Sequence, residues 1–180
     1  MFARLLTSAA ALGLMATVSF AANPDVGGAP MFETKNIVEN AVNSADHTTL
    51  VAAVTAAGLV ETLASAGPFT VFAPVNAAFA ALPAGTVDTL LKPENKATLT
   101  KVLTAHVVSG SITSEMIRAK ANKNGFVQLQ TVSGDALSVK VDGNKFFVFD
   151  ESGGVSEITI ADVIQSNGVI HVVNKVLLPK

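Results

Sequence analysis

Hydrophobic positions follow two different periods in this chain, a helical period in its first half and a period of two in its second half. Between residues 37 and 107, apolar side chains recur three and four positions apart, which places them on one face of a helix. From residue 126 onward, apolar and polar residues alternate, which is typical of strands with one buried face. The pattern therefore predicts a helical half followed by a strand half.

Local signals give these helices expected beginnings and ends. Helices are expected over residues 37–42, 47–57, 60–64, 76–82, 93–107 and 113–121. Asp46 and Asn76 are expected to cap the second and fourth of them, because Asp and Asn accept hydrogen bonds from first-turn N–H groups. Gly58 ends the second helix and Pro93 opens the fifth. The helical period places His106 on the apolar face of the fifth helix.

The strands are expected at 69–72, 126–132, 136–141, 145–149, 156–161 and 169–177. Within the strand 145–149, Phe147 and Phe149 share one face, while Phe146 and Val148 share the other. Both faces are apolar, which leaves two interpretations open. The strand is covered on both sides by core, or Phe146, Phe147 and Phe149 belong to an apolar patch that contacts a partner or a greasy ligand.

The beginning of the chain predicts export. A single positive charge at Arg4 precedes an apolar run from Leu5 to Val18, which is too short to span a bilayer and is typical of a signal peptide. We expect a signal peptide over residues 1–21, cut before Ala22, a flexible arm over 22–33 rich in Pro and Gly, and a single domain over 34–180. The protein is then periplasmic or secreted, with no membrane span after removal of the signal peptide.

Composition excludes several classes of function. The chain has no Cys, Trp or Tyr, which excludes disulfides and thiol catalysis and removes the side chains that dominate tight interfaces. Without Arg4, 11 Lys and Arg (12 − 1) stand against 14 Asp and Glu, so nucleic acid is not an expected partner. Because Trp and Tyr are missing, contacts with a partner are expected to be weak.

No catalytic, cofactor-binding or metal-binding residues are predicted. His47, His106 and His171 show none of the close pairings typical of zinc ligands. The sequence contains no Gly-x-Ser-x-Gly elbow and no phosphate-binding Gly-x4-Gly-Lys loop. Core histidines that form hydrogen bonds are the expected outcome, and the protein is expected not to be an enzyme.

Three segments carry a family resemblance: Gly67-Pro68-Phe69-Thr70-Val71-Phe72-Ala73-Pro74-Val75-Asn76-Ala77-Ala78-Phe79, Leu103-Thr104-Ala105-His106-Val107-Val108-Ser109-Gly110, and residues 167–179. They are similar, in order and spacing, to the motifs of the fasciclin (FAS1) domain family, and the similarity extends over about residues 35–179. The resemblance implies an α+β fold, a wedge of two β-sheets with about seven strands, flanked by several short helices. It resembles the bacterial, single-domain, secreted type.

The resemblance also identifies residues and limits what they imply. The family-motif residues, expected to be mainly structural, are Thr70, Phe72, Pro74, Asn76, Phe79, His106, Gly168, Ile170 and His171. The family's tyrosine is replaced here by Ala105, and its animal Asp-Ile integrin determinant by Val176-Leu177, so integrin binding is not implied.

Two functions remain open from the sequence. The resemblance together with export indicates a non-enzymatic interaction module for adhesion, whose partner is an unidentified cell-surface or matrix protein or polysaccharide. The alternative is a carrier or sensor of a small apolar ligand, held in a pocket lined by Phe, Leu and Val between sheets and helices.

Overall fold

The computed structural model of the protein describes residues 23–180. The expected signal peptide, residues 1–21, and its cleavage point therefore lie outside the described residues. None of the helices in the described part is long and apolar enough to cross a membrane.

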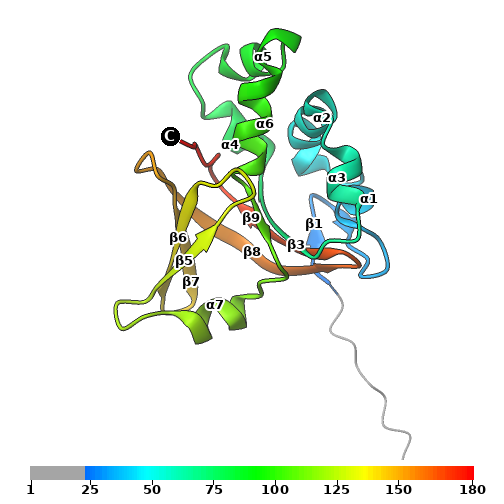
Figure 1. Ribbon diagram of the computed structural model, residues 1–180. Helices are drawn as coiled ribbons and strands as arrows, with labels where there is room; N and C mark the ends of the chain where they lie inside the picture. The colour runs from blue at the N-terminus through cyan, green and yellow to red at the C-terminus, as the bar shows by residue number, and fades with distance from the viewer. Residues whose placement is uncertain (1–22) are drawn as a thin grey trace, which may run out of the picture.

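Seven strands form one curled sheet (Figure 1). They are β3 (Phe69–Pro74), β4 (Val107–Ser109), β5 (Phe126–Gln130), β6 (Ala136–Asp142), β7 (Lys145–Phe149), β8 (Val155–Gln165) and β9 (Gly168–Val173), in the spatial order β4-β3-β9-β8-β7-β6-β5. Only β3 and β9 pair in parallel. An isolated bridge between Val108 and Thr131 brings the two edges together, so the sheet is nearly closed.

The long strand β8 joins the two parts of this sheet. Its first residues pair with β7, and the rest of the strand pairs with β9. The register shifts twice between Ile158 and Val163, and Asp162 at this irregularity has a φ of 58°. Such bulges bend a strand, which lets one strand serve both parts.

Seven α-helices cover the sheet: α1 (Ile37–Ala41), α2 (Thr48–Ala57), α3 (Val60–Ala64), α4 (Asn76–Ala80), α5 (Thr86–Leu90), α6 (Lys96–Thr104) and α7 (Ser114–Lys120), with 3₁₀ turns at Ala45–His47 and Pro93–Asn95 among the described residues. Figure 1 shows α1, α2 and α3 grouped on one side and α7 below the β5–β7 meander. The α+β class with seven main strands and short helices is therefore confirmed.

The apolar residues form two cores, one on each side of the sheet. The first lies between the helices α1–α6 and the strands β3, β8 and β9, and includes Leu50 and Ile170. The second fills the interior of the curled sheet above α7 and includes Phe72, Leu137 and Ile117. The two cores share strands, so a side chain on β3 or β9 faces one core or the other in alternation.

The part of the expected flexible arm, 22–33, that the structure describes, residues 23–33, is folded onto the domain. Two short strands, β1 (Asp25–Val26) and β2 (Ala29–Pro30), form an antiparallel hairpin. Val26 and Met31 are buried in the first core, and the Asn23 side chain hydrogen-bonds both the N–H and the C=O of Ile164. Proline and glycine suggested disorder, but two apolar side chains suffice to anchor this segment on the domain.

The structure also corrects the helix caps. Asn76 does not cap its own helix; its side-chain oxygen accepts hydrogen bonds from the Thr49 N–H, 3.0 Å away, and the Thr48 hydroxyl, 3.2 Å away. Both donors belong to the first turn of α2, where Asp46 makes no capping bond. Asn76 therefore caps a helix that precedes it by nearly thirty residues, which periodicity in one segment does not reveal.

One expected helix is shorter than its pattern. The helix expected over 93–107 begins as a 3₁₀ turn and ends at Thr104, and residues 107–109 form β4 instead. A strand of three residues exists because β3 supplies its hydrogen-bond partners, so its local sequence carries no strand period. His106 therefore lies between a helix and a strand, not on a helix face.

Candidate functional site

The family-motif residues on β3 lie inside the protein. Thr70 is fully buried; its hydroxyl donates to the Gly110 C=O at 2.6 Å and accepts from the Ile112 N–H at 2.8 Å. Phe72 is fully buried and stacks on His171, with ring centroids 5.7 Å apart. Pro74 ends β3, and Phe79 is buried on α4. These side chains hold the strand against its neighbours and offer nothing to solvent.

His106 is a buried clamp between α6 and the end of the chain's last segment. Its Nδ1–H donates to the Val102 C=O at 2.7 Å, and its Nε2 accepts from the Leu177 N–H at 2.9 Å. The neutral ring, with its proton on Nδ1, therefore has a hydrogen-bond partner at both nitrogens. Burial lowers the pKa of His106 to about 4, because a charged ring has no water around it.

His171 and His47 play the same part elsewhere. The His171 Nε2–H donates to the Ile112 C=O at 2.8 Å, and its Nδ1 accepts from the Asp162 N–H at 3.3 Å. His47 lies 2.9 Å from the Ser44 hydroxyl through Nδ1. Burial lowers the pKa of both rings. Within residues 23–180, no group of three or more His, Cys, Asp or Glu is placed to hold a metal ion.

Glycine at position 168 is required by close approach and not by an unusual φ. A Cβ at Gly168 would lie 2.0 Å from the Phe69 C=O oxygen, a backbone atom that cannot move without breaking the β3–β9 pairing. Ile170, two residues further along β9, is buried in the first core. Both motif residues therefore serve the parallel strand pair.

Asn167, which was not among the predicted site residues, joins three separate segments. Its Oδ1 accepts from the Ile37 N–H at 3.0 Å, and its Nδ2 donates to the C=O groups of Leu63 and Ser65, both at 2.7 Å. One buried amide thus connects the beginning of α1 to the end of α3. The available signal was its place at the start of the family-like segment 167–179, directly before Gly168.

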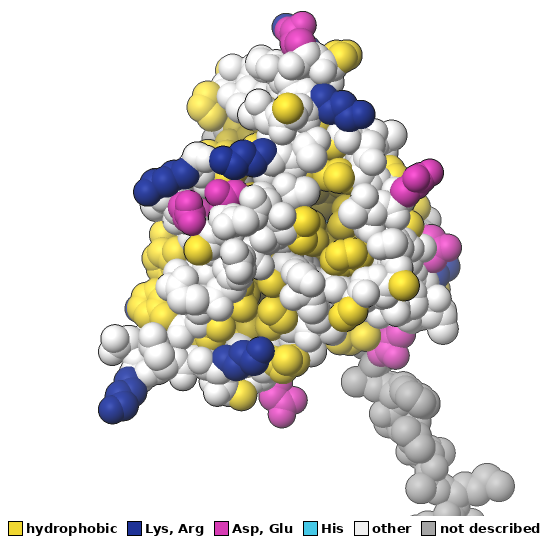
Figure 2. Space-filling model, in the orientation of Figure 1, with side chains coloured by type: hydrophobic (Ala, Val, Ile, Leu, Met, Phe, Trp, Pro, Cys, Tyr) yellow, Lys and Arg dark blue, Asp and Glu magenta, His cyan; other side chains and the backbone are white. Residues whose placement is uncertain are grey.

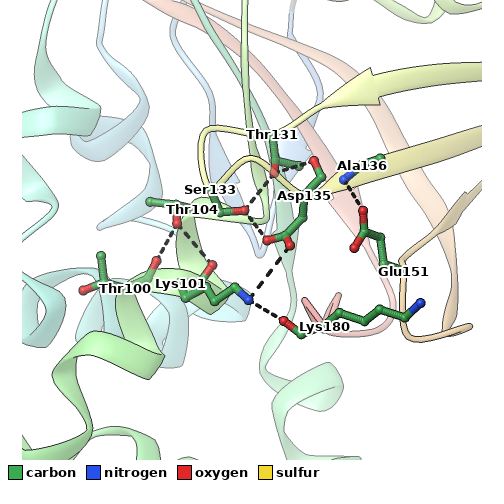
Figure 3. Close-up of polar contacts among 9 residues, drawn as sticks. All are labelled: Thr100, Lys101, Thr104, Thr131, Ser133, Asp135, Ala136, Glu151 and Lys180. Atoms are coloured by element: carbon green, nitrogen blue, oxygen red, sulfur yellow. Dashed lines mark hydrogen bonds and ion pairs between the residues drawn. The ribbon is translucent and has the colours of Figure 1, made fainter.

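A polar cluster beside α6 resembles a functional site, but its side chains form hydrogen bonds and an ion pair with one another (Figure 3). The Lys101 Nζ lies 4.0 Å from an Asp135 carboxylate oxygen and donates to the Lys180 C=O. The Ser133 hydroxyl donates to the Asp135 carboxylate at 2.5 Å and lies 2.8 Å from the Thr131 hydroxyl. The cluster braces the β5–β6 turn against α6, and it leaves no nucleophile beside a free base.

The two faces of β7 differ, so neither interpretation of this strand, core on both sides or an apolar patch of Phe146, Phe147 and Phe149, holds for all of it. Phe146 is 5% exposed and belongs to the second core, so it does not belong to a surface patch. Phe147 and Phe149 are half-buried on the outer face, where Phe126 on β5 lies 5.8 Å from Phe149 between ring centroids. We call Phe126, Phe147 and Phe149 the aromatic patch. Lys140, paired between Phe126 and Phe147, places a positive charge in it.

The aromatic patch gives a testable contrast with the core. Replacing Phe147 with serine is expected to cost less than about 1.5 kcal/mol of folding free energy, since a half-buried ring loses only part of its transfer energy. Urea unfolding followed by circular dichroism measures this, with Val155→Ser, a 37% exposed neighbour on β8, as the control. A protein that fails to fold would show that Phe147 is a core residue.

A second apolar surface lies among the first three helices. An apolar groove of about 130 Å³ opens between α1, α2 and α3, with Ile37, Leu50 and Leu63 at its floor. Val42 on its rim is 55% exposed. Figure 2 shows that, on the face it presents, hydrophobic side chains gather towards the middle while charged side chains stand mainly at the margins, and no histidine is visible there. On this face, apolar side chains are therefore exposed and available for contact.

Comparisons with known proteins identify relatives of this chain. A model of the fasciclin domain matches residues 45–179. The "Protein sll1483" of Synechocystis is 50% identical over 143 residues, covering 79% of this chain and 73% of the relative. The "Immunogenic protein MPB70" of Mycobacterium bovis is 37% identical over 144 residues, covering 77% of this chain and 66% of the relative.

A solved structure supports the same fold. The structure of a FAS1 domain pair from the insect cell adhesion molecule fasciclin I matches with a TM-score of 0.57 at 23% identity. The match covers 69% of this chain and 42% of the insect chain. At this identity the likeness concerns the fold.

Proposed function

Because the chain belongs to the fasciclin domain family, whose members are non-enzymatic adhesion or extracellular proteins, we propose that it is an exported interaction module working in adhesion at a cell surface or in an extracellular matrix. The protein itself is a non-enzymatic member of that family. Its expected partner is a surface or matrix protein or polysaccharide, and its expected location is the periplasm or the extracellular space.

One observation supports this proposal most. Polar side chains of the family motifs form internal hydrogen bonds, as Thr70, His106 and His171 do. The aromatic patch and the apolar groove remain at the surface. An arrangement of this kind within residues 23–180 is suited to contact other molecules.

The affinity of a single contact is expected to be low. The chain has neither Trp nor Tyr, and its one Arg outside the expected signal peptide, Arg118, lies over the Phe146 ring and donates to the Gly143 C=O at 2.7 Å. The side chains that dominate tight interfaces are therefore missing or engaged. Adhesion is therefore expected to depend on many weak contacts that form together.

The carrier alternative finds less support. The apolar groove has about 130 Å³, whereas pockets that enclose a small molecule have about 300–1,000 Å³. A groove of this size accommodates one or two side chains of a partner and leaves most of a ligand exposed.

An adhesion assay tests the proposal. Beads coated densely with the exported protein are expected to attach to cells of its own host, while the soluble protein competes only at about micromolar concentrations or above, because many copies bind together on a bead. Attachment is counted by microscopy. Beads carrying the protein unfolded by heat are the control. Equal attachment of both kinds of bead would contradict the proposal.

A further inference from the structure

The apolar groove selects what it can hold through its lining. All of its lining side chains are aliphatic except Thr55, and the Thr55 hydroxyl already donates to the Val51 C=O at 2.8 Å. A polar group placed in the groove would therefore lose its hydrogen bonds to water without replacement. What enters must be an apolar side chain.

The walls of the groove are fixed before any partner arrives. Val38, Val42 and Val60 line it, and β-branched side chains have few alternative rotamers. Asn167 hydrogen-bonds the Ile37 N–H at one wall and the Leu63 C=O at the other, which sets the separation of α1 and α3. A preformed site loses little entropy on binding.

The surroundings of the groove are acidic. No Lys or Arg occurs between residues 36 and 91, and Glu39 and Glu61, which follow Val38 and Val60 in the sequence, are exposed. Two lysines stand near the ends of these helices: Lys35 lies over the Phe32 ring before α1, and the Lys96 ammonium lies beside Gly58 at the end of α2. A partner that carries positive charges next to its apolar side chain is therefore complementary.

We propose that the apolar groove docks a basic amphipathic segment of another protein, which inserts one or two aliphatic or aromatic side chains and places Lys or Arg beside Glu39 and Glu61. This inference rests on the proposed function and names the surface and the chemistry of its partner.

Two synthetic helical peptides test the inference. Both have the same leucine face, and one carries Lys and the other Glu on its polar face. The Lys peptide is expected to bind the full exported protein about tenfold more tightly than the Glu peptide at low salt, and the difference is expected to shrink at about 0.5 M salt through screening. Fluorescence anisotropy of labelled peptide measures both affinities.

Variants locate the binding. Val42→Gln is expected to weaken the Lys peptide about fivefold or more, because the rim loses a branched apolar contact. The matched control is Val132→Gln, at a valine that is 49% exposed and outside the groove. Glu61→Gln is expected to reduce the preference for Lys over Glu while leaving the fold intact, because Glu61 is exposed.

Four outcomes would overturn the inference. Equal affinity for both peptides would show that charge plays no part, and equal weakening by both valine variants would place the contact elsewhere. Self-association of the protein that Val42→Gln abolishes would make a second copy the occupant. If the beads still attach to cells while the Lys peptide fails to bind, the proposed function stands and this inference alone fails.

Discussion

The Asn167→Ala protein is expected to lose roughly 2–6 kcal/mol of folding free energy, because it leaves three backbone groups without a partner, and each of the two that are buried costs about 1–3 kcal/mol. The groups are the Ile37 N–H and the C=O of Leu63 and of Ser65, all bonded by the one amide. Asn167 is 6% exposed, so water replaces these bonds poorly. A loss of this size is comparable to the total stability of many domains.

Urea unfolding followed by circular dichroism measures the loss. The matched control is Asn95→Ala, since the Asn95 amide also donates to a helix C=O, that of Thr89 at 2.7 Å, but at an exposed position. This control is expected to cost less than about 1 kcal/mol, the usual net value of one hydrogen bond. Equal midpoints for the two variants would show that Asn167 does not hold α1 and α3 together.

Periodicity predicted the parts of this fold in which neighbours along the chain are also partners. The strands β5, β6 and β7 form a meander whose expected limits lie within two residues of the observed ones, because each pairs with the next strand along the chain. The expected buried histidines at 106 and 171 are observed as well. Local alternation is sufficient where contacts are local.

Long-range contacts explain what periodicity missed. Asn76 was expected to cap the helix it begins and caps α2 instead, because the side chain of one segment satisfies the N–H groups of another. The hairpin at residues 25–30 exists because Val26 reaches the core between helices and sheet. These arrangements depend on the positions of distant segments, which no window of the sequence contains.

For the candidate surfaces too, the sequence predicted one part and missed another. Alternation correctly separated Phe147 and Phe149 from Phe146, but only the structure decides which face is covered. The apolar groove was not predicted, since α1, α2 and α3 each show an ordinary apolar face in the sequence. Whether three such faces close completely or leave a groove depends on the side chains that meet, which is a property of packing.

Acid is expected to unfold this protein through its histidines. Each folded-state pKa lies below the value of about 6.5 for an unfolded chain, and that of His106 is lowered to about 4 by burial. The unfolded state therefore binds protons that the folded state does not. The contribution of the neutral histidines to the free energy of unfolding is fully present above about pH 7, and it is lost as the pH drops from about 6.5 to 4. His106 alone then accounts for a loss of about 3 kcal/mol, at about 1.4 kcal/mol per pKa unit.

His47 and His171 add to this loss, because burial lowers the pKa of each ring as well. Urea midpoints at pH 7, 6, 5 and 4.5 are expected to fall steadily. In His106→Gln the slope of stability against pH is expected to decrease by up to about 1.4 kcal/mol per pH unit, because one proton fewer is bound on unfolding. A midpoint that stays constant from pH 7 to 5 would mean that protonated rings are accommodated in the folded state. The hydrogen bonds of two of these rings argue against that. The Leu177 N–H donates to His106 Nε2, and the Asp162 N–H donates to His171 Nδ1. A second proton on either ring would therefore point at another donor.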